Sequence, residues 1–579
     1  MPEELAESSG VRLARIGCGR FEKDQSEKQG NDKMIHSFNK SMRLLTTSAA
    51  MALLMASAPQ AFAATPADTL VQGWAFDDII TLDPGEAFEI STAEVTANTY
   101  SKLVNLDMND TSKVVGELAE SWTISEDGMT YTFKLKPGLK FASGNPITAE
   151  DVAFSFERAV KLDKSPAFLL TQFGLNGDNV ADKAKAADET TFVLSVDKAY
   201  APSFVLNVLT STVTSVLDKK VVMENAKPVT PTAEYKYDTD FGNEFLKTGY
   251  AGSGPYKIRE WRANEVVVLE RNDNYFGEKP ALARVIYRHM KESAGQRLAL
   301  ENGDVDVARN LEPGDVDAVS KKEGIALTSA PKGTLYYFSL NQKNENLAKP
   351  EVVEAFKYLV DYDAIGETLI KGIGTIHQTF LPAGQLGALG DKPYKLDVAK
   401  AKELLAKAGL ADGFTVTMDV RNTQPVTGIA ENVQQTLAQA GIKLEIIPGD
   451  GKQTLTKYRA RQHDIYIGQW GSDYFDPNSN AETFTYNPDN SDEGKTKTLA
   501  WRNAWDVPEL TKKTQAALLE KDSAARAAIY EDLQKQVLTT GPFVVIFQQT
   551  EVAGYSDKLK GYKLGPSFDT NFVYTVSKD

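Results

Sequence analysis

Strand-like and helix-like patterns of apolar side chains alternate along this chain. Residues 131–135 alternate apolar and polar positions with a period of two and lie between turn-forming residues at 126–128 and 137–138, which predicts a hairpin strand. Residues 414–420 alternate in the same way, and the apolar run at 544–547 is typical of a buried strand. Interleaved strand and helix patterns favour an α/β or α+β fold over an all-helical or all-β one.

The helical segments begin at residues that cap helices. Thr148 and Asp151 form a capping-box pattern before an apolar run, and Asp397 precedes a periodic segment at 398–408. A third helix is expected through residues 524–538. No repeat of solenoid length and no low-complexity tract interrupts these elements.

A short apolar run near the start of the chain has the pattern of a secretory signal peptide. Lys40 and Arg43 precede the apolar residues 44–56, and Ala-Phe-Ala at 61–63 supplies a small-residue cleavage site. A membrane-spanning helix needs about 20 apolar residues, so this run is too short to span. The alternative is a buried core helix.

The signal begins unusually late in the chain. We expect residues 34–63 to be the signal peptide, with cleavage after Ala63, and residues 1–33 to be an upstream extension ahead of a true start at Met34. The single cysteine, Cys18, lies in that extension. The rest of the chain has no thiol, which suits an oxidising compartment such as the periplasm.

Composition narrows the function classes. The 579 residues include 64 Lys+Arg and 79 Asp+Glu, a net charge of −15, with 42% apolar and 25% charged residues. These fractions are typical of a soluble globular protein and exclude a collagen-like or disordered chain. One cysteine excludes an intramolecular disulfide framework, and the acidic balance argues against nucleic-acid binding.

Motifs that would support catalysis are missing from the sequence. The histidines do not form an H-E-x-x-H pair, GSGP at 252–255 lacks the G-x-S-x-G elbow, and GIG at 372–374 is not continued as G-x-G-x-x-G. We therefore expect no enzyme, no catalytic residue, no metal site and no cofactor, and an exported hydrolase is a remote alternative. The histidines are His36, His289, His377 and His463.

Seven phrases in fixed order resemble one family, the extracytoplasmic solute-binding proteins of the peptide/nickel class. This is solute-binding protein family 5, which includes the dipeptide- and oligopeptide-binding proteins of ABC transporters. The resemblance covers essentially all of residues 64–579. The phrases are ELAESW at 117–122, EDGMTYTFKLKPG at 126–138, ITAEDVAFS at 147–155, GSGPY at 252–256, NYFG at 274–277, ENGDVD at 301–306 and DYDAI at 361–365.

The resemblance implies an α/β fold, a bilobal periplasmic-binding-protein clamshell (type II-like, class C) with an extra subdomain in lobe one. Lobe one would take residues 64–335, lobe two residues 336–547, and residues 548–579 would return to lobe one. The hinge crossings would then fall near residues 333–336 and 547–548. A ligand held between the lobes would shift an open–closed equilibrium.

The resemblance also implies a function. The protein would be the periplasmic substrate-binding component of an ABC importer, a monomer that captures a small peptide and delivers it to a permease in the inner membrane. Nucleic acid is not expected as a partner. The alternative is the same fold binding an opine, a sugar or a metal chelate.

The main candidate for ligand binding is the loop that follows residues 464–470. Trp470 ends a predicted strand, and the turn at 471–472 leaves Asp473 in a loop. A carboxylate beside a tryptophan can hold an ammonium group by charge pairing and cation–π contact, although an Asx turn is an equally simple role for Asp473. The segment resembles the family's ligand loop, in which an Asp here pairs with the α-amine of the peptide.

Arg421 is the second candidate, at the end of the strand predicted for 414–420. Its planar guanidinium suits a carboxylate. The resemblance implies that Arg421 binds the C-terminal carboxylate of a dipeptide. The alternative is a solvated surface arginine. The sequence departs from the dipeptide-binding branch at Thr423, where that branch has an aromatic residue. Weaker candidates for ligand contact, each of which could equally serve in packing, are Tyr337, Trp74 and Thr92.

Overall fold

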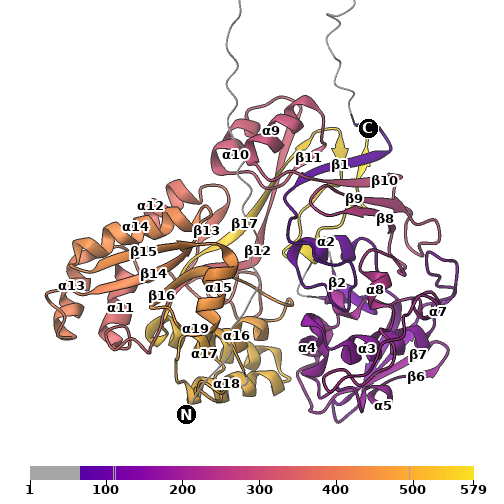
Figure 1. Cartoon of the computed structure of the whole chain (residues 1–579), viewed down its shortest axis with the longest axis horizontal. Helices are drawn as coiled ribbons and strands as arrows, with labels where there is room; N and C mark the ends of the chain where they lie inside the picture. Colours follow the sequence, from indigo (N-terminus) through magenta and orange to yellow (C-terminus); the bar gives the residue numbers. More distant parts are fainter. Residues whose placement is uncertain (1–64, 108–109, 111–112, 495) are drawn as a thin grey trace, which may run out of the picture. The chain divides into compact units, whose positions relative to one another are not determined.

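The computed structural model describes residues 65–579 except 108–109, 111–112 and 495. The predicted upstream extension and signal peptide, residues 1–63, lie outside the described residues. Helices and strands alternate through the described chain (Figure 1), which confirms the mixed α/β class. None of its described helices is both long enough and apolar enough to cross a membrane.

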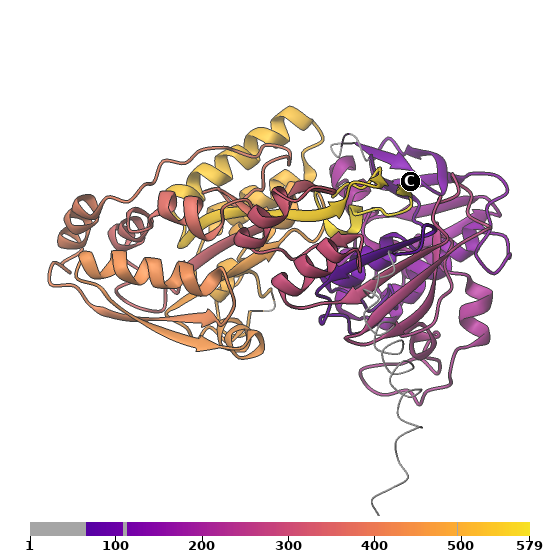
Figure 2. The same cartoon turned by 90° about the horizontal axis from the view of Figure 1, so that it is seen from above.

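The largest sheet of the described chain has 11 strands and is organised around two long ones, β12 (Ile325–Leu340) and β17 (Phe543–Ser556), which run through its middle (Figures 1 and 2). On one side follow the mutually parallel strands β16 (Ile465–Gly471), β14 (Thr415–Arg421) and β15 (Lys443–Gly449). On the other side follow β11 (Val307–Ala308), β1 (Thr69–Trp74), β10 (Arg284–His289), β9 (Val266–Arg271) and β8 (Tyr256–Arg262). The short strand β13 (Gly374–Ile376) pairs with β17.

The pairing of β12 with β17 is interrupted near its middle. Ile325 to Pro331 lie opposite Ser556 to Thr550, and the ladder resumes only at Leu335, opposite Gln548. Because β1 and its neighbours lie on the side of the first stretch and β16 lies beside the second, the interruption separates two half-sheets. The lobe bounds expected from the sequence, 64–335, 336–547 and 548–579, stay a prediction.

The half-sheet of β14, β15 and β16 is covered by amphipathic helices whose apolar faces form one core with it. The predicted cap at Asp397 is confirmed, because its carboxylate accepts the Lys400 N–H at 2.8 Å. The predicted helix at 524–538 is confirmed as part of α19. The helices of this core are α11 (Pro350–Tyr358), α13 (Val398–Lys407) and α14 (Val426–Gln439), whereas α19 (Ser523–Thr540) packs into a second core with β12, β16 and β17.

A separate antiparallel sheet forms the extra subdomain expected in the first half. Its order is β4 (Ala119–Ile124), β5 (Thr130–Leu135), β7 (Thr191–Ser195) and β6 (Ala184–Asp188), with α3 (Ala149–Leu162) packed against it. The predicted hairpin strand is β5, and the predicted capping box is confirmed, with the Thr148 N–H donating to Asp151 at 2.9 Å. Phe133, Phe156 and Phe192 are fully buried in the subdomain core.

This subdomain also touches the segment that follows β16. Phe204 packs edge-on against Tyr474, with ring centroids 5.9 Å apart. The Ala201 N–H donates to the Leu518 carbonyl at 2.8 Å, at the end of α18 (Pro508–Leu519), and Arg526 of α19 donates to the Ser203 hydroxyl at 3.1 Å. The two halves therefore meet beside the loop that carries Asp473.

Candidate functional site

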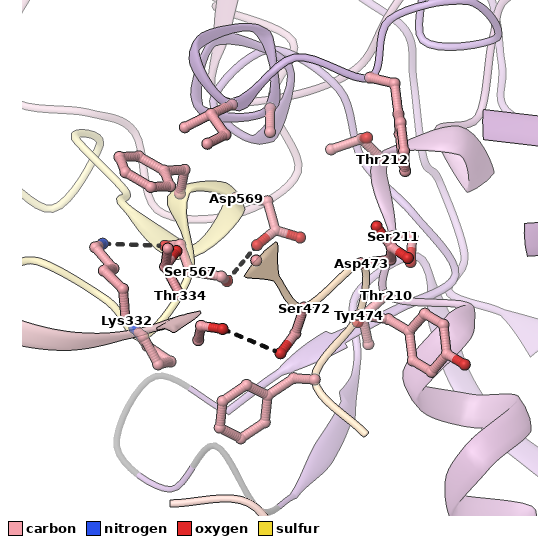
Figure 3. A pocket seen from close by; sticks show the side chains of 18 of the residues that line it. Thr210, Ser211, Thr212, Lys332, Thr334, Ser472, Asp473, Tyr474, Ser567 and Asp569 are labelled. Carbon is pink, nitrogen blue, oxygen red and sulfur yellow. Dashed lines mark hydrogen bonds between the residues drawn. The ribbon is translucent and has the colours of Figure 1, made fainter. Parts of the chain in front are cut away.

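A cavity of about 230 Å³ lies where the interrupted part of β12 meets the loop after β16. Because its walls belong to both half-sheets and to the extra subdomain, a molecule inside it would contact both halves of the protein (Figure 3). The wall segments are residues 87–90 at the start of α2 (Ile90–Ala97), 210–212, 332–334, 471–475 and 566–569.

Asp473 reaches this cavity from the loop after β16. The loop is fixed on both sides, because the Ser472 hydroxyl donates to Asn480 at 2.8 Å and the Asp473 N–H donates to the Ser479 hydroxyl at 2.8 Å. Both partners belong to α16 (Pro477–Thr485). Within the described parts of the chain, the Asp473 carboxylate makes no ion pair. It is therefore a fixed, uncompensated acidic group on the cavity wall.

The surroundings of Asp473 disfavour its charged form. Burial raises the pKa of the Asp473 carboxyl to about 7; the nearby Glu482 carboxylate adds to the rise and Arg502 opposes it. Burial likewise raises the pKa of Glu482. A cation placed beside Asp473 would favour ionisation of its carboxyl, so a positively charged ligand group matches this position.

Lys332 lines the cavity, but its ammonium group is paired with other groups of the protein. Its ammonium lies 2.6 Å from the Glu551 carboxylate and donates to the Gly565 carbonyl at 2.7 Å and to Asn571 at 3.1 Å. It also lies 4.6 Å from the centre of the Phe568 ring. Three protein acceptors occupy the three N–H groups of the ammonium, so Lys332 has none to spare for a ligand carboxylate.

The Lys332–Glu551 pair is one side of a larger buried charge cluster. Arg309 donates to both oxygens of Glu94 at 2.9 and 3.0 Å and to Glu551 at 2.7 Å. Asn571 donates to Glu94 at 3.0 Å. Although burial alone would raise the pKa of Glu551, Arg309 and Lys332 lower it to about 2. The cluster joins α2, β12, β17 and the C-terminal segment behind the cavity wall.

The cavity is also lined by two carboxylates that were not predicted from the sequence. Glu89 precedes α2, and Asp569 lies in the short helix η4 (Phe568–Thr570). Burial raises the pKa of Glu89, with Asp78 and Glu86 adding to the rise and two backbone N–H groups opposing it. Neither residue lies in a motif with a chemical meaning of its own, so no local signal identifies them.

The other predicted binding residues do not line this cavity. Trp470 is half-buried in β16 opposite Leu335, and Arg421 is exposed at the end of β14. Tyr337 is buried, with its hydroxyl 3.2 Å from that of Tyr458. The structure thus brings Asp473, but not these three, to the cavity, and their assignment as ligand contacts stays a prediction.

Trp74 and Thr92 are buried in the first half. The Trp74 ring lies 4.8 Å from the Arg309 guanidinium and packs beneath the charge cluster. Thr92 is fully buried in α2. Neither lines the cavity, and their role in ligand contact likewise stays a prediction.

In the described residues, no group of His, Cys, Asp and Glu side chains is arranged to hold a metal ion.

Comparison with known proteins extends over most of the chain. The sequence profile of the family described as "Bacterial extracellular solute-binding proteins, family 5 Middle" matches residues 113–492. The "Probable D,D-dipeptide-binding periplasmic protein DdpA" of Escherichia coli strain K12 is 28% identical over 537 residues, which are 91% of this chain and 98% of the relative. The glutathione-binding protein GsiB of Shigella flexneri is 26% identical over 497 residues, 85% of this chain and 91% of the relative.

Solved structures extend the similarity to the fold. The ABC transporter-associated periplasmic binding protein DppA from Helicobacter pylori, in complex with the peptide STSA, superposes with a TM-score of 0.72 at 25% sequence identity. The match covers 88% of this chain and 97% of that one. It therefore includes both half-sheets and the extra subdomain, which confirms the bilobal α/β fold expected from the sequence.

Proposed function

Because this chain belongs to the bacterial extracellular solute-binding proteins of family 5, we propose that it is the periplasmic substrate-binding component of an ABC importer. It captures a small peptide between its two lobes and presents the closed form to a permease in the inner membrane. A relative named "Probable D,D-dipeptide-binding periplasmic protein DdpA" and a solved structure in complex with the peptide STSA support a peptide as the ligand.

The observation that carries this proposal is the uncompensated Asp473 carboxylate in a cavity bounded by both halves. A peptide brings a terminal ammonium group that can pair with a carboxylate through charge-assisted hydrogen bonds. Contact with both walls lets such a ligand favour the closed arrangement over the open one. Trp470 and Arg421 stay predicted ligand contacts, although neither lines the cavity.

Thermal unfolding with and without candidate ligands tests the proposal. A ligand at 100 times its Kd adds about 2.7 kcal/mol to the free energy of unfolding, which gives a clear rise in Tm. We expect stabilisation by di- and tripeptides with free amino termini, and none by an opine, an oligosaccharide or a nickel chelate at equal concentration. Stabilisation by one of these three classes alone would contradict a peptide ligand.

We also propose that the protein is exported with cleavage after Ala63, is a monomer, and releases its ligand chemically unchanged. The signal-like pattern at 34–63 and the absence of catalytic motifs support these points. Intact-mass analysis of the periplasmic protein should give a chain beginning at Ala64, and a peptide recovered after incubation should keep its mass. A shortened peptide would indicate a hydrolase.

Peptide affinity should fall as the pH is lowered through about 7. The raised pKa of Asp473 means that protons compete with the ligand ammonium at this carboxyl, and the raised pKa of Glu89 acts in the same direction. The terminal amine has an ordinary pKa of ~7.7–8.0 and stays protonated at lower pH. Proton competition then predicts at least ~tenfold weaker binding at pH 5.5 than at pH 7.5.

Isothermal titration calorimetry at the two pH values measures this effect. The variant Asp473→Asn is expected to bind weakly at both, with most of the pH dependence removed. An equally steep pH dependence in the variant would place the titrating group elsewhere.

A further inference from the structure

The side chains that line the cavity carry more negative charge than one terminal ammonium can neutralise. Resting on the proposed function, we propose that this site selects small peptides that carry a second positive charge on a lysine or arginine side chain. The ligand class is then a cationic peptide, held at two acidic positions on different segments of the cavity wall.

The negative charge comes from three separate segments. Glu89, Asp473 and Asp569 all line the cavity, and none of them makes an ion pair with any described residue. Glu89 accepts the Phe88 N–H at 3.1 Å, and Asp569 accepts the Ser567 hydroxyl. These neutral donors satisfy individual lone pairs but bring no compensating positive charge.

Among the described residues that line the cavity, the one basic side chain does not balance this charge. Lys332, which lines the cavity, is committed to Glu551, Gly565 and Asn571, as described above. Arg421 is exposed at the end of β14 and is not among the lining residues. The charge that faces a ligand in the cavity is therefore negative, although the buried charge cluster behind the wall contains both acidic and basic side chains.

The acidic groups divide into two positions. Because α2 packs against η4, Glu89, which precedes α2, and Asp569 belong to one wall. Asp473 comes from a different segment, the loop after β16 (Figure 3). A terminal ammonium at Asp473 leaves the second wall unneutralised. A basic side chain extending from the same peptide supplies the missing charge, and the rings of Phe88 and Phe568 offer apolar contact for its methylene stem.

One polar side chain of the cavity wall also lacks a hydrogen-bond partner among the described residues. Ser211 lines the cavity and is 5% exposed, and its hydroxyl oxygen has no hydrogen-bond partner among the described residues. Ser211 and Asp473 both belong to the lining of the cavity, and both are labelled in Figure 3. Because a buried hydroxyl without a partner is unfavourable, this oxygen indicates a place where a ligand N–H is accepted.

Matched tripeptides test the inference by isothermal titration calorimetry. Ala-Lys-Ala and Ala-Gln-Ala have similar size and the same termini but differ by one positive charge, and the series is repeated with the variable residue at each position. We expect the tightest lysine peptide to bind at least tenfold more strongly than its glutamine counterpart, and Ala-Glu-Ala to bind more weakly than both.

The variants locate the origin of this preference. Glu89→Gln, Asp569→Asn and the double variant should reduce the lysine-to-glutamine affinity ratio, to below about threefold in the double variant. Glu431→Gln is the matched control, since Glu431 is exposed on α14 and outside the cavity, and it should keep the full ratio. Circular dichroism confirms that each variant is folded before its ratio is compared.

The outcomes separate this inference from the proposed function. A lysine-to-glutamine ratio near one in the unmodified protein, or a ratio that survives both substitutions, overturns the cationic selectivity while leaving peptide binding in place. Failure of all peptides to bind overturns the proposed function and the selectivity with it. A tenfold ratio that falls in the double variant supports the inference.

Discussion

The variant Arg309→Met is expected to lose about 3–5 kcal/mol of unfolding free energy, because it removes the positive centre of a buried charge cluster. Glu94 is fully buried and receives two hydrogen bonds from Arg309. Without them Glu94 keeps the Asn571 donor at 3.0 Å but, among the described residues, has no oppositely charged side chain within ion-pair distance. Because methionine and arginine have similar volumes, the loss of stability should come mainly from the uncompensated Glu94 carboxylate and only to a small extent from lost packing.

Urea unfolding followed by circular dichroism measures this loss. Arg262→Met is the matched control, because Arg262 pairs with Glu260 and Glu265 at an exposed position where ion pairs contribute little. The control should lose a small fraction of the amount lost at Arg309. Equal losses in the two variants would mean that the cluster is not a determinant of stability.

The variant Asp473→Asn is expected to bind peptides at least ~tenfold more weakly, a loss of about 1.4 kcal/mol in binding free energy. Asparagine keeps the size of the side chain and one acceptor oxygen but removes the charge. The hydrogen bonds that fix the loop come from the backbone of Asp473 and from Ser472, so the loop should keep its position.

Calorimetry with a free and an N-acetylated form of the same peptide isolates the charge effect. In the unmodified protein the acetylated peptide should bind much more weakly, and in Asp473→Asn the two affinities should converge. Unchanged affinity in the variant would remove Asp473 from the ligand site.

Local features of the fold were predictable because their causes are local. The capping box at Thr148 and the cap at Asp397 are hydrogen bonds between residues three positions apart, and both occur in the structure. The alternation at 414–420 reflects the two faces of β14. The long strands β12 and β17 were not predictable as such, since their pairing joins residues far apart in the chain and is interrupted near Pro331.

Only the part of the candidate site that lies in a single loop, Asp473, could be predicted from the sequence. Asp473 follows a strand and a glycine turn, which places it at a strand end from sequence alone. Glu89 and Asp569 lie far from it in the sequence, and only the packing of α2 against η4 brings them to one wall. The sequence around Lys332 gives no sign that this lysine is paired. Its partner, Glu551 of β17, is distant in the chain and lies 2.6 Å away only in the folded structure.

The cavity wall takes residues from positions 87 to 569, and its last contributors are residues 566–569. Synthesis of the chain must therefore pass Asp569 before the wall is complete. A ribosome that stops earlier releases a polypeptide with most of its core but no finished site. Under the proposed function, ligand capture therefore begins only after nearly the whole described chain has been made, and a nonsense mutation as late as residue 565 is expected to abolish it.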